Sequence, residues 1–278
     1  MTSADLVIRG GTIVTSTSML RAALVIKDGK IAAITSDENI PRAGRVIEAE
    51  GLHVLPGVID VHVHLRDPGM TYKEDFGTGT AAAAAGGVTC VFDMPNNSPP
   101  TMDVGSLNAK KEAARTKAIV DYGLYGLLTV GSLKEIDPFV EAGVIGFKCY
   151  MGETTGKIPP PSDGEMLEQF SEISKLGRRV AVHAENDSIL QYRVSKLREA
   201  GRVYPRAHYE SRPQIVEEEA VERAILYSRD TSCPIHIAHL SSGVGAAAVR
   251  RGKRTGIRVT AETAPHYLIL DDGRYPQL

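Results

Sequence analysis

The sequence has no tryptophan, and aromatic residues make up only 5% of its 278 residues. A platform of aromatic side chains that stacks the bases of single-stranded nucleic acid is therefore not expected. An excess of charge is also lacking, because 32 basic residues stand against 34 acidic ones and the net charge is -2. No field of one sign would attract nucleic acid or an anionic membrane. We expect neither as a partner.

Cysteine is scarce as well. The three cysteines, Cys90, Cys149 and Cys233, are odd in number and widely spaced. This argues against a disulfide framework and favours a reducing compartment. No apolar run approaches the roughly 20 residues that span a bilayer, and the first residues lack the basic and apolar regions of a secretory signal. We expect a cytoplasmic protein.

The pattern of the chain changes near Pro56-Gly57. Before this point, short apolar runs alternate with tight turns, and Asp28-Gly29 between two such runs is a strong hairpin signal. We interpret residues 1–55 as a small β unit, the N-terminal portion of a β-sandwich. In residues 56–278, Val- and Ile-rich runs of strand length alternate with segments of helix length. This is typical of parallel strands covered by helices, as in a (β/α) barrel.

Seven strands and seven helices are predicted in the second region. The strands are expected at residues 58–64, 88–94, 119–127, 144–150, 179–185, 234–240 and 258–263. The helices are expected at residues 78–85, 104–117, 132–142, 164–176, 187–200, 214–228 and 243–254. A TIM-like (β/α)₈ barrel needs eight strands. The fold class is therefore α/β, either an open sheet or, as we favour, a barrel whose last unit is missing from this sequence.

Histidines gather near the predicted C-terminal ends of the strands, where a barrel carries its active site. His62 and His64 end the first strand, and residues two apart in a strand face the same side. His183 and His239 lie near the ends of two later strands. Converging imidazoles suit zinc or a similar metal, and incidental histidines would not be expected to cluster in this way. His236, by alternation, is expected on the opposite side from His239, packed in the core.

Lys148 interrupts an otherwise apolar strand. A lone buried lysine is costly unless it is paired or neutralised. One interpretation is an ion pair with a carboxylate of the barrel. The other is chemical: desolvation lowers the pKa of the amine, and the neutral amine can react with carbon dioxide. The resulting carbamate is an oxygen ligand that can bridge two metal ions, and such pairs activate water.

These motifs resemble those of the cyclic amidohydrolases, a group that includes dihydroorotase, allantoinase and dihydropyrimidinase. The resemblance covers essentially the whole chain. Residues 60–69, DVHVHLRDPG, are most similar to the dihydroorotase signature. The segments at residues 73–79, 86–89 and 94–97 follow it as in that family.

The resemblance implies a site with two divalent metal ions. It implies that His62 and His64 bind one ion, that a carboxylated Lys148 bridges to the second, and that His183 and His239 bind that second ion. Zinc is favoured by histidine-rich ligation, although manganese, cobalt and iron can occupy such sites. The family also uses an aspartate after the eighth strand as a metal ligand and catalytic acid–base. This sequence has no position for it, so we expect a chain truncated at its C-terminus.

The expected substrate depends on Arg66 and Asn96. In dihydroorotases the matching arginine and asparagine hold the substrate carboxylate, and a guanidinium can grip a carboxylate with two charge-assisted hydrogen bonds. The plainer alternative for Arg66 is a loop salt bridge with Asp67 or Asp75. We expect hydrolysis of a cyclic amide C–N bond. The favoured reaction interconverts dihydroorotate and carbamoyl aspartate, as in pyrimidine biosynthesis.

Two alternatives stay open. Residues 147–156, and residues 211–213 with 217–220, resemble allantoinase or dihydropyrimidinase as much, which favours a hydrolase of allantoin or a hydantoin. The loop at residues 152–156 would lie where it can touch the substrate. The other alternative is a non-catalytic dihydroorotase-like paralogue that assembles with an active partner. The resemblance further implies a small cyclic amide or ureide as ligand, and a homo-oligomer, either a dimer or a tetramer.

Overall fold

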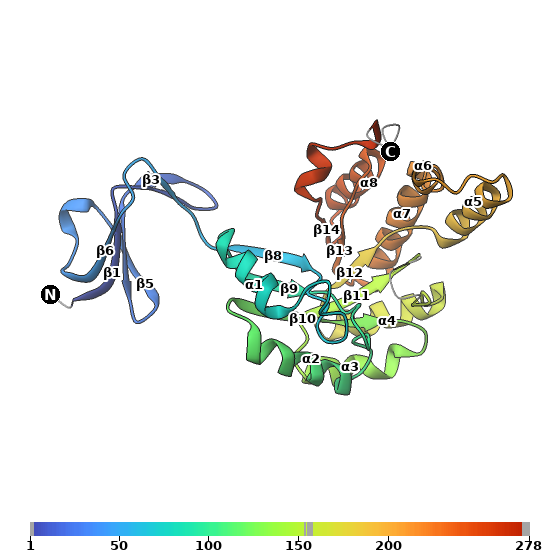
Figure 1. Ribbon diagram of the computed structural model, residues 1–278, viewed down its shortest axis with the longest axis horizontal. Helices are drawn as coiled ribbons and strands as arrows, with labels where there is room; N and C mark the ends of the chain where they lie inside the picture. Colours follow the sequence, from blue (N-terminus) through green and yellow to red (C-terminus); the bar gives the residue numbers. More distant parts are fainter. Residues whose placement is uncertain (1–2, 153, 155–157, 274–278) are drawn as a thin grey trace. The chain divides into compact units, whose positions relative to one another are not determined.

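The computed structural model describes residues 3–152, 154 and 158–273. The chain divides into two compact units, Met1–Val58 and Ile59–Leu278, and Figure 1 shows the elements of each. The sequence pattern placed this boundary after residue 55.

The first unit consists of two small sheets. The larger sheet has the order β5-β4-β1-β6 and the smaller one the order β3-β2-β7. Their strands are β1 (Ala4–Arg9), β2 (Thr12–Val14), β3 (Met19–Arg21), β4 (Ala23–Lys27), β5 (Lys30–Thr35), β6 (Ala43–Glu48) and β7 (His53–Val54), with the short helix η1 (Asp37–Asn39) after β5. The predicted hairpin is confirmed between β4 and β5. Asp28 and Gly29 both have positive φ, as a two-residue turn of type I′ requires.

The second unit contains a seven-stranded sheet in which the strand order follows the chain, from β8 to β14. The strands are β8 (Val58–Val63), β9 (Val88–Asp93), β10 (Asp121–Leu128), β11 (Gly146–Tyr150), β12 (Val180–His183), β13 (Ile235–Ile237) and β14 (Val259–Ala261). All pairs from β9 to β14 are parallel. The sheet is curled as in a barrel, and the α/β fold class predicted from the sequence is confirmed.

Helices connect these strands, and most of them pack against the outer side of the sheet (Figure 1). They are α1 (Phe76–Ala85), α2 (Val104–Lys117), α3 (Ile136–Glu141), α4 (Asp163–Lys175), α5 (Asp187–Glu199), α6 (Pro205–Glu210), α7 (Gln214–Thr231) and α8 (Gly243–Arg254), with the 3-10 helices η2 (Ser132–Glu135) and η3 (Pro265–Leu268). Helix α6 has no counterpart among the predicted helices. It is a six-residue helix that begins at a proline, too short to show an apolar periodicity.

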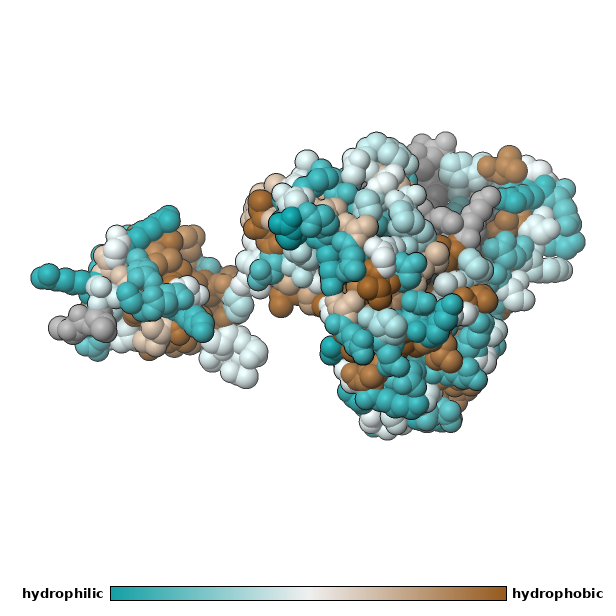
Figure 2. Space-filling model, turned by 90° about the horizontal axis from the view of Figure 1, so that it is seen from below, coloured by the Kyte–Doolittle hydropathy of each residue, from teal (hydrophilic) through white to brown (hydrophobic). Residues whose placement is uncertain are grey.

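The main core lies between the sheet and the helices. Phe147 of β11 packs edge-on against Phe139 of α3, with 6.1 Å between ring centroids, and both side chains are fully buried. On the face drawn in Figure 2, hydrophilic residues lie between the hydrophobic ones over the second unit, as is normal for a protein surface. Within the part of the chain that the structure describes, no helix is long and apolar enough to cross a membrane.

Candidate metal centre

Four histidines converge at the C-terminal end of the curled sheet. The Nε2 atoms of His62 and His64, from β8 and the residue after it, lie 3.3 Å apart. Nδ1 of His183, at the end of β12, lies 3.0 Å from Nε2 of His239, which follows β13. The rings of His62 and His239 are 5.4 Å apart between centroids. The structure therefore brings together the four histidines that the sequence placed at strand ends.

The backbone at His239 explains how this side chain reaches the group. Strand β13 ends at Ile237, and His239 adopts a positive φ of 39°, a conformation that few residues other than glycine adopt. The chain thus turns out of the sheet before His239. The strict alternation of strand side chains stops at this point.

Three of the histidines are held through their second ring nitrogen. Nδ1 of His64 lies 2.7 Å from Oδ1 of Asn96, and Nε2 of His183 lies 2.7 Å from the Glu185 carboxylate. Nδ1 of His62 contacts the carboxylate of Glu262. Oxygen partners of this kind fix the tautomer and the orientation of metal-binding histidines. The ring nitrogens that face one another are thereby left as the potential ligand atoms.

Burial favours the neutral form of three of these imidazoles, those of His62, His64 and His239. It lowers the pKa of His64 to about 3 and the pKa of His239 to about 2, and it also lowers the pKa of His62. Neutral imidazole is the form that binds metal.

Lys148 is fully buried, and its Nζ has no hydrogen-bond partner among the described residues. The amine lies 5.2 Å from the centroid of the Tyr150 ring. Burial lowers the pKa of Lys148 to about 8, so the reactive neutral amine is more abundant than in an exposed lysine. Within the described residues no carboxylate forms an ion pair with Lys148. The structural interpretation of this lysine as half of an ion pair therefore has no support.

The arrangement fits a pair of divalent ions. Two nitrogens bound to one ion at about 2.0–2.1 Å lie roughly 3 Å from each other, which matches the spacing within each histidine pair. Within the described ranges, no three His, Cys, Asp or Glu side chains are grouped so that they could hold one ion. Each histidine pair therefore needs a further ligand. A carbamate on the otherwise unpartnered Lys148 would supply an oxygen to both ions.

The histidines and Lys148 line one wall of a cleft of about 1490 Å³, which continues along helices α5, α6 and α7. Arg66, Asn96, Tyr150 and Thr154 also line it. Residues 153, 155 and 156 of the loop predicted to touch substrate lie outside the described residues.

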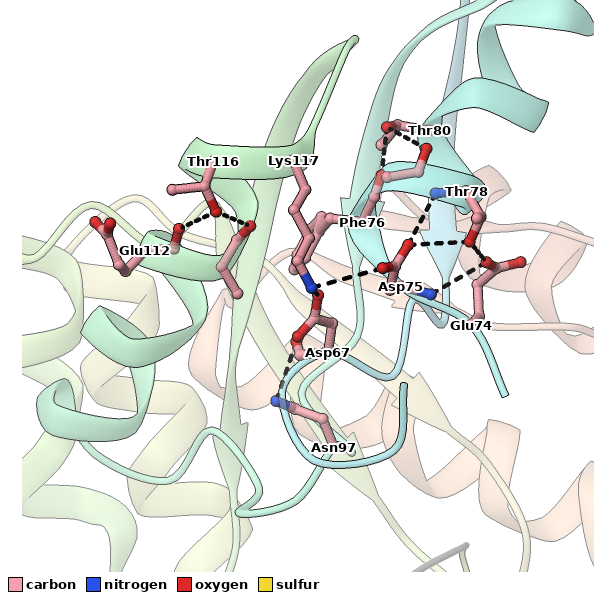
Figure 3. Close-up of polar contacts among 12 residues, drawn as sticks. Asp67, Glu74, Asp75, Phe76, Thr78, Thr80, Asn97, Glu112, Thr116 and Lys117 are labelled. Carbon is pink, nitrogen blue, oxygen red and sulfur yellow. Dashed lines mark hydrogen bonds and ion pairs between the residues drawn. The ribbon is translucent and has the colours of Figure 1, made fainter. Parts of the chain in front are cut away.

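Arg66 and Asn96 lie side by side in this cleft. Arg66 has a positive φ of 58°, and its Nη1 donates a hydrogen bond of 2.8 Å to the backbone oxygen of Asn96. The loop salt bridge considered for Arg66 is absent from the described contacts, because Asp67 and Asp75 pair instead with Lys117 (Figure 3). The side chain of Asn96 already holds His64. A substrate-binding role for Arg66 and Asn96 stays a prediction.

Sequence reasoning missed the part played by Glu262. This residue follows β14 directly, so the rule that found the histidines at strand ends could also have found it. Glu262 contacts His62 and lies 3.2 Å from Nε2 of His236. Burial raises the pKa of Glu262, but hydrogen bonds from His236 and His62 outweigh burial and hold it well below its usual range. Glu262 is therefore an ionised carboxylate beside the histidine cluster.

The prediction that His236 packs on the side opposite His239 is wrong. His236 is in register with Ala181 of β12, which is in register with Lys148 of β11. Residues in register on parallel neighbours face the same side of the sheet, so His236 shares the face of Lys148. Alternation counted from His239 gave the wrong side, because His239 no longer belongs to the strand.

Comparison with known proteins identifies the family of this chain. Residues 53–268 match the model of the amidohydrolase family. The chain belongs to that family.

Proteins similar to this chain include curated allantoinases. The allantoinase of Solibacter usitatus (strain Ellin6076) is 41% identical over 96% of this chain and 59% of its own length. That of Deinococcus radiodurans is 41% identical over 96% of this chain and 60% of its own length. The chain thus spans about three fifths of the length of these relatives.

Solved structures similar to this chain include hydantoinases and dihydropyrimidinases. The L-hydantoinase (dihydropyrimidinase) from Arthrobacter aurescens aligns with a TM-score of 0.94 and 34% identity, over 99% of this chain and 61% of that one. The dihydropyrimidinase from Brevibacillus agri NCHU1002 aligns with a TM-score of 0.87 and 31% identity, over 96% of this chain and 59% of that one.

Proposed function

We propose that this protein hydrolyses a C–N bond of a cyclic ureide, with allantoin as the first candidate and hydantoins as the second. The reaction class rests on one observation: two histidine pairs line the same cleft as the buried Lys148, whose amine has no hydrogen-bond partner among the described residues. The proposed substrate class rests on the names of the relatives. The relatives are called allantoinases at 41% identity, and the structural neighbours are called hydantoinases.

This proposal replaces dihydroorotate as the favoured substrate. The expectation of a dihydroorotase depended on Arg66 and Asn96, but in the structure each of these residues has a contact within the protein. The named relatives support the alternative that the loop and helix motifs had kept open. The structure does not support the alternative of a non-catalytic paralogue, because all five predicted ligands line the same cleft. The homo-oligomer and the cytoplasmic location stay predictions.

The chain's own residues would divide the work as follows. His62 with His64, and His183 with His239, would hold one divalent ion each, with a carboxylated Lys148 between them. When bound, such a pair supplies Lewis acidity for a substrate carbonyl and a water of lowered pKa. The ionised Glu262 would keep the Nδ1 proton of His62 in place, so that Nε2 faces inward.

Arg66 is the candidate for substrate orientation. Its guanidinium lines the cleft and uses one nitrogen on Asn96, so further N–H groups can donate to a ring carbonyl or a ureido oxygen. The burial of Asn96 and Tyr150 beside it limits the water that reaches this end of the cleft.

The test is a substrate comparison. The purified protein, loaded with zinc, manganese or cobalt in the presence of bicarbonate, is assayed on allantoin, hydantoin, dihydrouracil and dihydroorotate. We expect kcat/KM for allantoin or hydantoin to exceed that for dihydroorotate by at least about tenfold, which is about 1.4 kcal/mol of transition-state binding. Faster turnover of dihydroorotate, or none of any cyclic amide, would contradict the proposal.

A further inference from the structure

Helix α2 carries a lysine that is buried as deeply as Lys148 and belongs to no predicted ligand set. Nζ of Lys110 lies 2.7 Å from Oδ2 of Asp93, the last residue of β9. The two side chains are 0% and 1% exposed. Removing both charges from water is costly, and a well-packed apolar pair of similar volume is often as stable. The pair therefore calls for an explanation other than stability.

The other hydrogen bonds of Asp93 and Lys110 connect the pair to segments next to the metal centre. Oδ1 of Asp93 accepts a hydrogen bond of 2.8 Å from the backbone N–H of Leu65, the residue between His64 and Arg66. This contact fixes the backbone where the first histidine pair ends and the cleft begins.

The amine of Lys110 reaches a second segment of the same wall. It donates to the backbone oxygen of Met94 at 2.6 Å and to Oδ1 of Asn97 at 3.4 Å. Asn96 stands between these two acceptors and holds the ring of His64 through its side chain. One ion pair thus fixes the two strand ends from which His64, Arg66 and Asn96 extend.

We propose that Lys110 and Asp93 form a positioning pair that sets the geometry of His64, Arg66 and Asn96. Its consequence for catalysis rests on the proposed function, whereas its consequence for metal binding does not. Arg66 is held at a positive φ, and a backbone conformation of this kind persists only where the surroundings over-determine it. The Leu65–Asp93 bond on one side and the bond from Met70 N–H to the Arg66 oxygen, 2.9 Å, on the other supply that constraint.

A second lysine of the same helix holds this loop from outside. Nζ of Lys117 lies 2.8 Å from Asp67 and 3.5 Å from Asp75, and Asn97 approaches the backbone oxygen of Asp67 at 3.5 Å, as Figure 3 shows. The Lys117 side chain is 38% exposed, so solvent weakens its ion pairs. The buried Lys110 pair is the contact that water cannot replace, and it is the one assigned the positioning role.

The experiment separates positioning from mere stability. In Lys110→Met, the buried Asp93 loses its partner. In the double variant Asp93→Asn with Lys110→Met, no unpaired charge is left, and the asparagine Oδ1 can still accept from Leu65. The matched control is Lys111→Met on the same helix, because the Lys111 amine donates to the backbone oxygen of Ala142, which follows α3, and not to Met94 or Asn97.

Three readouts are taken on each variant: zinc affinity by competition with a chelator, amide hydrogen exchange of residues 63–70 and 94–98, and the melting temperature. We expect both Lys110 variants to bind zinc about 10–100-fold more weakly, as changes around metal ligands do, and to exchange faster in these two segments. The double variant should regain most of the melting temperature lost by the single one. Lys111→Met should keep wild-type zinc affinity and exchange.

The outcomes decide between the two roles even if no cyclic ureide is hydrolysed, since none of the readouts is an activity. A double variant that recovers its melting temperature but not its zinc affinity supports positioning. A double variant that recovers both to within about twofold of wild type overturns the proposal. If cyclic ureides are hydrolysed, a rise in KM that exceeds the fall in kcat in the double variant would further support the placement of Arg66.

Discussion

The buried amine of Lys148 has no hydrogen-bond partner among the described residues. Four imidazole rings lie at the same end of the sheet and line the same cleft. If a carbamate on this amine bridges two ions, Lys148→Met should lose the bridge and leave each histidine pair short of a ligand. We expect bound metal to fall from two ions per chain to at most one, and hydrolysis of the proposed ureide substrate to fall by more than about 100-fold, beyond what changes around the ligands cause.

Elemental analysis of the purified variant measures the first effect. Protein prepared with ¹³C-bicarbonate gives a second measurement, because wild type should show a carbamate carbon signal that the variant lacks. Equal metal content in wild type and variant would contradict the bridging role.

Glu262 supplies a second test at the level of one side chain. Its carboxylate contacts both His62 and His236 and is ionised. Glu262→Gln keeps the shape but removes the charge that favours a proton on Nδ1 of His62. We expect zinc affinity to fall about 10–100-fold. The control is Glu199→Gln, at an exposed position at the end of α5, which should leave the zinc affinity unchanged. An unchanged zinc affinity in Glu262→Gln would show that Glu262 does not support the metal centre.

Whole strands were easier to predict than their ends. All seven strands lie within or close to the predicted segments, because Val- and Ile-rich runs report burial on both faces of a parallel sheet. The fifth, sixth and seventh strands are much shorter than predicted, three or four residues each. Past β12 and β13, Ala184 and Ala238 are as buried as the strands themselves, so composition does not show where the backbone leaves the sheet.

This difference decided how well the site could be predicted. His62, His64 and His183 lie in a strand or next to its end, and alternation served for them. His239 lies beyond β13 in a turn with positive φ, which no composition rule foretells. The error over His236 came from that turn. Glu262 could have been found by its place directly after β14, but its contacts with His62 and His236 could not. The Lys110–Asp93 pair likewise depends on a contact between distant segments, which a single sequence does not reveal.

Helix α1 allows a test of how the loop before it is anchored. Oδ1 of Asp75 caps this helix by accepting from Thr78 N–H at 2.8 Å, and the same side chain pairs with Lys117. Asp75→Ala should cost about 1 kcal/mol for the lost cap, which corresponds to a melting temperature lower by about 2–4 °C in a domain of this size. Asp103→Ala at the start of α2 removes a comparable cap and is the matched comparison.

Calorimetry on the two cap variants distinguishes a local from a shared effect. Equal shifts mean that each aspartate acts only on its own helix. We expect the larger shift for Asp75, because Lys117 loses one of its two carboxylates in that variant. A smaller shift for Asp75 than for Asp103 would contradict this anchoring.

Across the whole molecule, the centre draws its residues from both ends of the sequence of the second unit. His62 and Glu262 are 200 residues apart and belong to β8 and the end of β14, the first and last strands of the sheet order. Their contact exists only when the sheet curls. Metal binding and formation of the curled sheet should therefore support each other, since a ligand that binds only the folded state stabilises it.

The same coupling predicts how stability depends on pH when metal is absent. In the unfolded chain Lys148 keeps its proton up to a pKa near 10.5, whereas in the folded protein burial lowers that pKa to about 8. Below pH 8 both states carry the proton, and the folded state bears the full cost of the buried charge, about 3 kcal/mol for a shift of this size. Between pH 8 and 10.5 the unfolded state binds more protons, so stability rises with pH. Above 10.5 the cost is gone.

Urea unfolding of metal-free protein in buffer free of carbon dioxide measures this effect. The contributions of other titrating groups to the pH dependence cancel in the difference between wild type and Lys148→Met, and the variant has no charge to bury at this position. We expect the variant to be the more stable protein at pH 7, and its advantage to shrink steadily as pH rises from 8 to 9.5. If the difference in stability stays constant over this range, the Lys148 amine keeps an ordinary pKa in the folded protein. That result would contradict the inference that burial makes the neutral amine more abundant.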